Sequence, residues 1–159
     1  SAFDWLLADR ETLRPVAFFA QRGVTRVKGR AFADPNLPVF LYAPAGASGP
    51  KFLMTNNYLV LKGYNFSDSY ALSVAHLADR LKGGGDFATN WPRSTKFPNL
   101  AQRQAIQAKL RQLGLYDGVV DGRIGPVSQA AFARFQASRG ELADGFIRYE
   151  SFEELSGLN

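Results

Sequence analysis

The chain has 159 residues, of which 46% are hydrophobic, and a formal net charge of +5. This length and composition are typical of one or two small globular domains, and they exclude a disordered chain. No apolar stretch approaches the roughly 18 residues of a membrane span. The lack of cysteine and the single histidine, His76, exclude disulfides, thiol nucleophiles and histidine-based metal clusters. We therefore expect no metal and no other cofactor.

The positive charge is concentrated in residues 1–82, which hold ten basic and six acidic side chains, whereas residues 100–159 hold seven of each. This mild excess suits an anionic polymer as partner, but nucleic-acid-binding modules usually show denser basic clusters. We therefore expect no nucleic acid partner. The sequence opens without a visible signal peptide, as in a cytoplasmic protein or in a mature or trimmed fragment.

A boundary is predicted after Lys82. Residues 83–97 are rich in Gly, Pro, Ser and Thr and have no helical or strand periodicity, which is typical of an exposed linker. We expect two units, residues 1–82 and residues 98–159. The fold class is α+β: a small mixed unit with an antiparallel sheet, linked to an all-α three-helix bundle.

In the first unit, residues 3–7 predict a short strand and residues 13–22 a short helix, because Pro15 is tolerated only near a first turn. The apolar runs 39–42 and 52–54 predict paired strands, because the Gly- and Pro-rich residues between them form a turn. Residues 58–61 fit either a strand or a helix.

A longer helix is predicted over residues 67–82. Ser67 is a good N-cap, and Asp68 suits the positive first turn. The spacing of Tyr70, Val74, Leu77 and Leu81 predicts one buried apolar stripe. His76 falls on the other side of this helix and has no catalytic partner at a useful spacing, so we expect a surface histidine.

The sequence of the second unit predicts three helices, over residues 100–113, 127–139 and 149–155. Residues 116–126 form a glycine-rich loop between the first two. Phe135 lies on the inward face of the second helix. A bundle of about 60 residues is close to the smallest size that folds alone.

The second unit closely resembles the bacterial peptidoglycan-binding domain, which is built on a three-helix bundle. The resemblance spans residues 100–157 and implies non-catalytic binding to cell-wall glycan or stem peptide. At position 128 this chain has Ser, whereas the family usually has Thr at the matching position. The matching positions are Arg103, Ile106, Gln107, Leu110, Leu113, Gly114, Tyr116, Gly118, Asp121, Gly122, Gly125, Pro126, Ala130, Ala131, Phe135, Gln136, Gly140, Asp144 and Gly145.

The first unit resembles the C-terminal end of the catalytic domain of lytic murein transglycosylases of the membrane-bound B type, a lysozyme-like domain. The family cleaves the β-1,4 bond between N-acetylmuramic acid and N-acetylglucosamine, leaves a 1,6-anhydro end and uses one Glu as acid and then as base. The matching positions are Gly49, Pro50, Phe52, Leu53, Asn57, Tyr58, Tyr64, Asn65, Ser67, Asp68, Tyr70, Ala71, Leu72, His76, Leu77, Ala78, Asp79 and Arg80.

The family's catalytic Glu lies in a helix upstream of the matching part. None of the chain's five glutamates, Glu11, Glu141, Glu150, Glu153 and Glu154, stands in the family's sequence context. We therefore name no catalytic residue. The simplest interpretation is that residues 1–82 are the tail of a truncated or proteolysed transglycosylase, inactive on its own.

Three residues of the first unit, Tyr64, Asn65 and Tyr70, match family positions that face the saccharide cleft. An amide supplies a donor and an acceptor to a sugar, and a tyrosine ring supplies an apolar face with a polar tip. The alternative is structural: Asn65 is a turn residue, and Tyr70 belongs to the apolar stripe.

In the second unit, the candidate ligand contacts are Tyr116, Asp121, Arg123 and Gln136, at the mouth of a groove. The alternative is that Asp121 only braces the loop, whose glycines supply unusual backbone angles. A calcium loop is excluded because its twelfth position, counted from Asp117, is a serine rather than the required Glu.

These features predict a peptidoglycan-binding protein of the periplasm or cell envelope, the C-terminal part of a lytic murein transglycosylase acting in cell-wall turnover. Its partners are glycan strands or stem peptide. The alternative is that the chain contributes cleft residues to an active enzyme whose catalytic Glu lies on an upstream segment absent from this chain. That segment is then a further partner.

Overall fold

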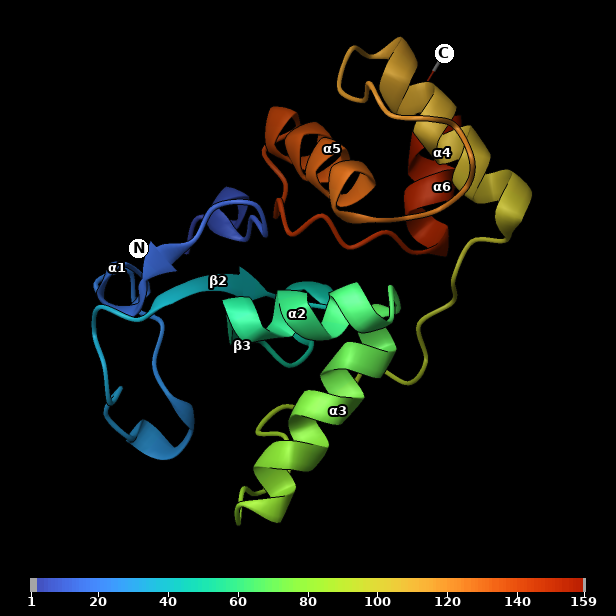
Figure 1. Cartoon of the computed structure of the whole chain (residues 1–159). Helices are drawn as coiled ribbons and strands as arrows, with labels where there is room; N and C mark the ends of the chain where they lie inside the picture. Colours follow the sequence, from blue (N-terminus) through green and yellow to red (C-terminus); the bar gives the residue numbers. More distant parts are fainter. Residues whose placement is uncertain (1–2, 159) are drawn as a thin grey trace.

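The computed structural model describes residues 3–158, which form an α+β chain with separate hydrophobic cores in its two halves (Figure 1). The first half contains η1 (Trp5–Leu7), β1 (Arg14–Pro15), α1 (Val16–Ala20), η2 (Val27–Gly29), β2 (Pro38–Tyr42), η3 (Gly46–Ser48), β3 (Phe52–Thr55), α2 (Asn56–Tyr64) and α3 (Asp68–Leu81). The second half contains α4 (Leu100–Gln112), α5 (Pro126–Ser138) and α6 (Tyr149–Ser156). None of the helices within residues 3–158 is long and apolar enough to cross a membrane.

The three strands form an antiparallel sheet in the order β1-β2-β3, which confirms the strands predicted at residues 39–42 and 52–54. Successive side chains of a strand point to opposite faces, so the central strand serves two cores. Phe40 and Tyr42 pack with Tyr58 of α2. Val39 and Leu41 pack with α1 on the other face. The sheet therefore joins the short N-terminal elements to the α2–α3 pair.

Two expectations for the N-terminal part are wrong. Residues 5–7 form the 3-10 helix η1 rather than a strand, because the Asp4 carboxylate accepts a hydrogen bond from the Leu6 amide at 3.1 Å and caps the turn. The helix expected over 13–22 is shorter, because Pro15 has extended backbone angles and pairs with β2, so that α1 begins at Val16.

The helix pair α2–α3 resolves one ambiguity and corrects one prediction. Residues 58–61 are helical, and Ser67 caps α3 by accepting a hydrogen bond from the Tyr70 amide. The predicted stripe is not core, because Leu77 is 60% and Leu81 81% exposed. The buried residues of α3, Ala71 and Leu72, lie in its first turns, and the rest of the helix extends beyond the sheet (Figure 1).

Residues 83–97 contain no helix or strand. Most of their side chains are exposed, as expected of a linker, but two aromatic residues are half-buried against the first half. The Phe87 ring stacks on His76 with centroids 4.0 Å apart and meets Trp91 edge-on at 5.5 Å. The segment therefore lies along the first half before it reaches α4, and the unit boundaries remain a prediction.

The second half is a bundle of three helices that lie within two residues of the predicted positions. Asn99 and Gln102 form a capping box at the start of α4, and Pro126 occupies the first position of α5. The three helices bury one continuous cluster. Its members are Ile106, Leu110, Tyr116, Ala131, Phe132, Phe135, Ile147 and Leu155.

Replacing Phe135 with alanine is expected to cost about 3–5 kcal/mol of the bundle's free energy of unfolding, because the ring is buried against Phe132. Urea titration followed by circular dichroism measures this change. Leu142→Ala, at a residue that is more than half exposed, is the control and is expected to change stability little. Equal effects of the two substitutions would contradict the packing described.

Candidate functional site

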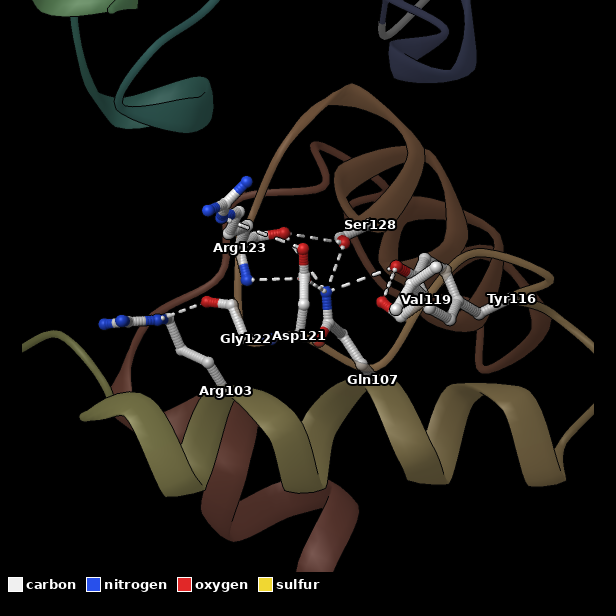
Figure 2. A network of polar contacts seen from close by, with 8 residues as sticks. All are labelled: Arg103, Gln107, Tyr116, Val119, Asp121, Gly122, Arg123 and Ser128. Carbon is white, nitrogen blue, oxygen red and sulfur yellow. Dashed lines mark hydrogen bonds and ion pairs between the residues drawn. The ribbon is translucent and has the colours of Figure 1, made fainter.

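The loop between α4 and α5 is organised by one buried side chain, Gln107 (Figure 2). Its Oε1 accepts a hydrogen bond from the Gly122 amide at 2.7 Å. Its Nε2 lies 3.1–3.3 Å from four acceptors: Tyr116 Oη, Asp121 Oδ1, Arg123 O and Ser128 Oγ. An amide can both donate and accept, so this one side chain ties the irregular loop to α4.

The loop accepts only small residues at two positions. A Cβ on Gly118 would lie 2.6 Å from the Tyr116 ring, and one on Gly122 would lie 2.5 Å from the Leu100 side chain. Gly122 also has φ +75°, which glycine adopts without strain. Arg103 completes the support, because its Nε donates to Gly122 O at 2.6 Å. Gly118 and Gly122 are therefore required by the close packing around them.

The exposed group on the loop is the Arg123 side chain, which is 92% exposed. Its backbone amide donates to Asp121 Oδ1 at 2.8 Å, and this hydrogen bond lowers the pKa of the Asp121 carboxyl. Its guanidinium points away from the network in Figure 2, with Nε 3.9 Å from Asp121 Oδ2. The backbone of Arg123 is therefore held in place while its charge is available at the surface.

The structure brings Tyr116, Asp121 and Arg123 into one network but places Gln136 in another. Tyr116 is buried, and its hydroxyl donates to Val119 O at 2.8 Å. Gln136 Oε1 accepts from the Gly145 amide at 2.9 Å, so Gln136 supports the turn before α6. Among the four candidates of this half, only Arg123 presents its functional group fully to solvent.

The candidates of the first half lie around the turn between α2 and α3. Tyr64 is 87% exposed, and Tyr70 is partly exposed. Asn65 caps the C-terminal end of α2, and its Oδ1 accepts a hydrogen bond from the Ser67 amide at 3.0 Å. This is the arrangement expected if Asn65 is a turn residue. Phe66, which sequence reasoning missed, is 88% exposed. The turn thus presents three aromatic rings to solvent.

Beneath this turn lies a charged cluster centred on Asp68. Its Oδ1 is 2.9 Å from Arg10 Nη1 and 2.8 Å from Lys62 Nζ, and it accepts a hydrogen bond from the Tyr58 hydroxyl. Burial raises the pKa of Asp68, but these partners outweigh it and hold the pKa below its ordinary value. Burial also raises the pKa of Tyr58. The cluster keeps the start of α3 attached to α2 and to the N-terminal segment.

The role of Gln107 was missed in the sequence, although a signal was present. Gln107 lies on the buried face of α4 with Ile106 and Leu110. A polar side chain at an apolar position requires internal partners.

Within residues 3–158, no three His, Cys, Asp or Glu side chains gather as metal ligands.

Comparisons with known proteins agree with both halves. Residues 1–79 match the model of the transglycosylase SLT domain, and residues 99–147 match that of the peptidoglycan binding domain. Two crystal structures of SltB3 from Pseudomonas aeruginosa, with NAG-anhNAM-pentapeptide and with NAG-NAM-pentapeptide, each align with a TM-score of 0.88 and 33% identity. The alignments cover 98% of this chain and 42% of the SltB3 chain. No curated protein matches the chain.

The fold and the matched domains define a class: a transglycosylase portion followed by a peptidoglycan-binding module. The chain is similar to lytic transglycosylases over both halves, and it spans 42% of the length of the SltB3 chains that it matches. The term module refers below to residues 98–159, and the term transglycosylase portion to residues 1–82.

Replacing Gln107 with leucine is expected to destabilise the module by about 1–3 kcal/mol, because the Gly122 amide and the Arg123 carbonyl lose their buried partner. Urea titration measures the loss, and amide hydrogen exchange at Gly122 is expected to accelerate. Gln112→Leu, the same substitution at an exposed position at the end of α4, is the matched control. Unchanged exchange at Gly122 in the Gln107 variant would show that the side chain does not brace the loop.

Proposed function

We propose that the chain binds peptidoglycan in the periplasm or cell envelope, as the C-terminal part of a lytic murein transglycosylase acting in cell-wall turnover. The observation that carries this proposal is the module's loop, in which buried groups hold the backbone while the charge of Arg123 is exposed. The SltB3 structures, which hold glycan-peptide fragments, support the same ligand class for this chain.

The two halves offer complementary chemistry for this polymer. An exposed guanidinium binds carboxylates through charge-assisted hydrogen bonds, which suits Arg123 to the acidic groups of the wall. Tyr64 and Tyr70 offer flat rings to a saccharide, and the Asn65 amide offers polar contacts to its hydroxyl or acetamido groups. Tyr116 and Gln136 enter the proposal through the loop and the turn that they support, and Asp121 enters it because its carboxylate holds the Arg123 amide.

We further propose that the 159-residue chain binds the wall without cleaving it. Burial and the neighbouring Glu141 raise the pKa of Glu154. The Nε atom of Arg139 lies 2.9 Å from Glu141 Oε1 and 3.2 Å from Glu154 Oε1. The three side chains therefore form a structural ion-pair network. Glu11 lies exposed in the N-terminal segment. No glutamate therefore combines the family context with a site suited to glycoside chemistry.

A second function is favoured by the apolar surface of the transglycosylase portion. Phe66, Leu77 and Leu81 are largely exposed. Large exposed apolar side chains are typical of surfaces that contact another polypeptide. Under this alternative, the portion contributes cleft residues to an active transglycosylase whose catalytic Glu lies on an upstream segment.

Incubating the purified chain with sacculi is expected to retain protein on the insoluble wall and to release no anhydro-muropeptides. Co-sedimentation and mass spectrometry of the soluble fraction measure the two outcomes. An active lytic transglycosylase serves as the positive control for product detection. Anhydro products released by the chain alone would overturn the proposed inactivity, and Glu11 would then be the first residue to replace.

Replacing Arg123 with alanine is expected to weaken sacculus binding while the stability changes by no more than about 0.5 kcal/mol, because the side chain is exposed. Binding isotherms by co-sedimentation and thermal melting measure the two effects. Arg93→Ala removes the same charge from the exposed segment before the module and is the matched control. Unchanged binding together with an unfolded module would identify Arg123 as a brace instead.

A further inference from the structure

The module and the transglycosylase portion contact each other through two turns. The Asp144 carboxylate, just before the last helix, accepts a hydrogen bond from the Ala47 amide of η3 at 2.8 Å. Its other oxygen accepts from the Phe146 amide at 3.1 Å. One carboxylate therefore closes its own turn and binds the backbone of the other half. A charged acceptor strengthens such a bond relative to a neutral one.

Both turns are shaped for this contact. Gly46 has φ +62°, and a Cβ there would lie 2.5 Å from Asp144 Oδ2. Gly145 has φ +66°, and a Cβ there would lie 2.6 Å from the Gln129 carbonyl oxygen. Gln136 holds the Asp144–Gly145 turn from inside the module. A side chain at Gly46 would therefore push the two surfaces apart, and one at Gly145 would distort the turn that carries Asp144.

A second contact is made by Arg10, which belongs to the charged cluster described above. Its guanidinium lies 4.1 Å from the centre of the Tyr42 ring and pairs with Asp68. Its Nη2 also donates to Gln129 Oε1 of α5 at 3.4 Å. Figure 1 shows the N-terminal segment that carries η1 lying near α5. The same arginine therefore organises the transglycosylase portion and reaches the module.

Between these two contacts, η1 lies against α5. A cavity of about 510 Å³ lies between the N-terminal segment and α5, lined by residues that include Trp5, Arg10, Gln129 and Ala130. The cavity interrupts the packing there, so the Asp144 and Arg10 contacts add to the contact of η1 with α5 in orienting the module. Loss of the Asp144 contact is therefore expected to loosen the module.

We propose that the Asp144 contact fixes the module on the transglycosylase portion and makes the chain a rigid two-site binder of one glycan strand. The Arg123 loop and the Tyr64–Tyr70 turn then meet the polymer at a constant spacing, and the second contact forms without the entropy cost of ordering a free domain. The inference rests on the proposed function, because it specifies a polymeric strand as the ligand. It also gives Asp144, Gly46 and Gln136 a role between the two halves.

The orientation is tested by electron spin resonance distance measurements. The chain has no cysteine, so Ser69→Cys on α3 and Ala108→Cys on α4 introduce two exposed labelling positions on helices. We expect one narrow distance distribution, which broadens when Asp144→Ala is added. Asp117→Ala, which removes an exposed carboxylate elsewhere in the module, is the control and leaves the distribution narrow. A distribution that stays narrow in the Asp144 variant overturns the proposal.

The consequence for binding is tested with two probes, intact sacculi and soluble NAG-NAM-pentapeptide. Asp144→Ala is expected to weaken sacculus binding on the order of tenfold or more, while binding of the soluble fragment stays within about twofold. Gly46→Ala disturbs the same contact from the other half and is expected to weaken sacculus binding in the same way. Its control is Gly63→Ala, because a Cβ at Gly63 meets open space.

Thermal melting confirms that the variants used are folded. Unchanged sacculus binding in a folded Asp144 variant with a broadened distance distribution overturns the two-site binding. Failure of the unsubstituted chain to bind sacculi overturns the proposed function instead. The distance distribution still decides in that case whether the orientation is fixed.

Discussion

The module depends on one buried amide. The loop between α4 and α5 has no regular hydrogen-bonding pattern, so a side chain must satisfy its backbone groups. Gln107 does so from inside the bundle, since it accepts from the Gly122 amide and donates toward the Arg123 carbonyl. A single buried side chain thereby holds a glycine-rich loop in one defined conformation. The exposed charge of Arg123 rests on that support, because its backbone is held while its side chain is not.

Local features of the sequence predicted much of the fold. Caps such as Ser67 and the apolar runs of the central strands act over a few residues, and the structure confirms them. The prediction that Leu77 and Leu81 are buried is wrong for a long-range reason. The two residues have the spacing of a helical stripe, but no element covers them, because α3 extends beyond the sheet. The failure at residues 3–7 is local, since the side chain of Asp4 favours a tight turn in an otherwise apolar run.

The candidate site was only partly predictable, because spacing alone does not say which side chain is buried. The loop and its resemblance indicated Tyr116, Asp121 and Arg123. The structure separates them, since the hydroxyl of Tyr116 is engaged internally and the guanidinium of Arg123 is exposed. Gln136 is engaged with a turn that contacts the other half, which no local pattern reveals. Contacts between residues 97 positions apart, such as Ala47 with Asp144, require the assembled chain.

The most direct test of the account is a nuclear magnetic resonance titration of the ¹⁵N-labelled chain with soluble NAG-NAM-pentapeptide. If the ligand binds both surfaces, amide shift changes are expected at residues 119–124 of the module and at residues 64–70 of the transglycosylase portion, with the amides of α6 unaffected. Shift changes confined to α6 or to the sheet would contradict the account, because the ligand would then bind a surface on which neither Arg123 nor Tyr64 lies.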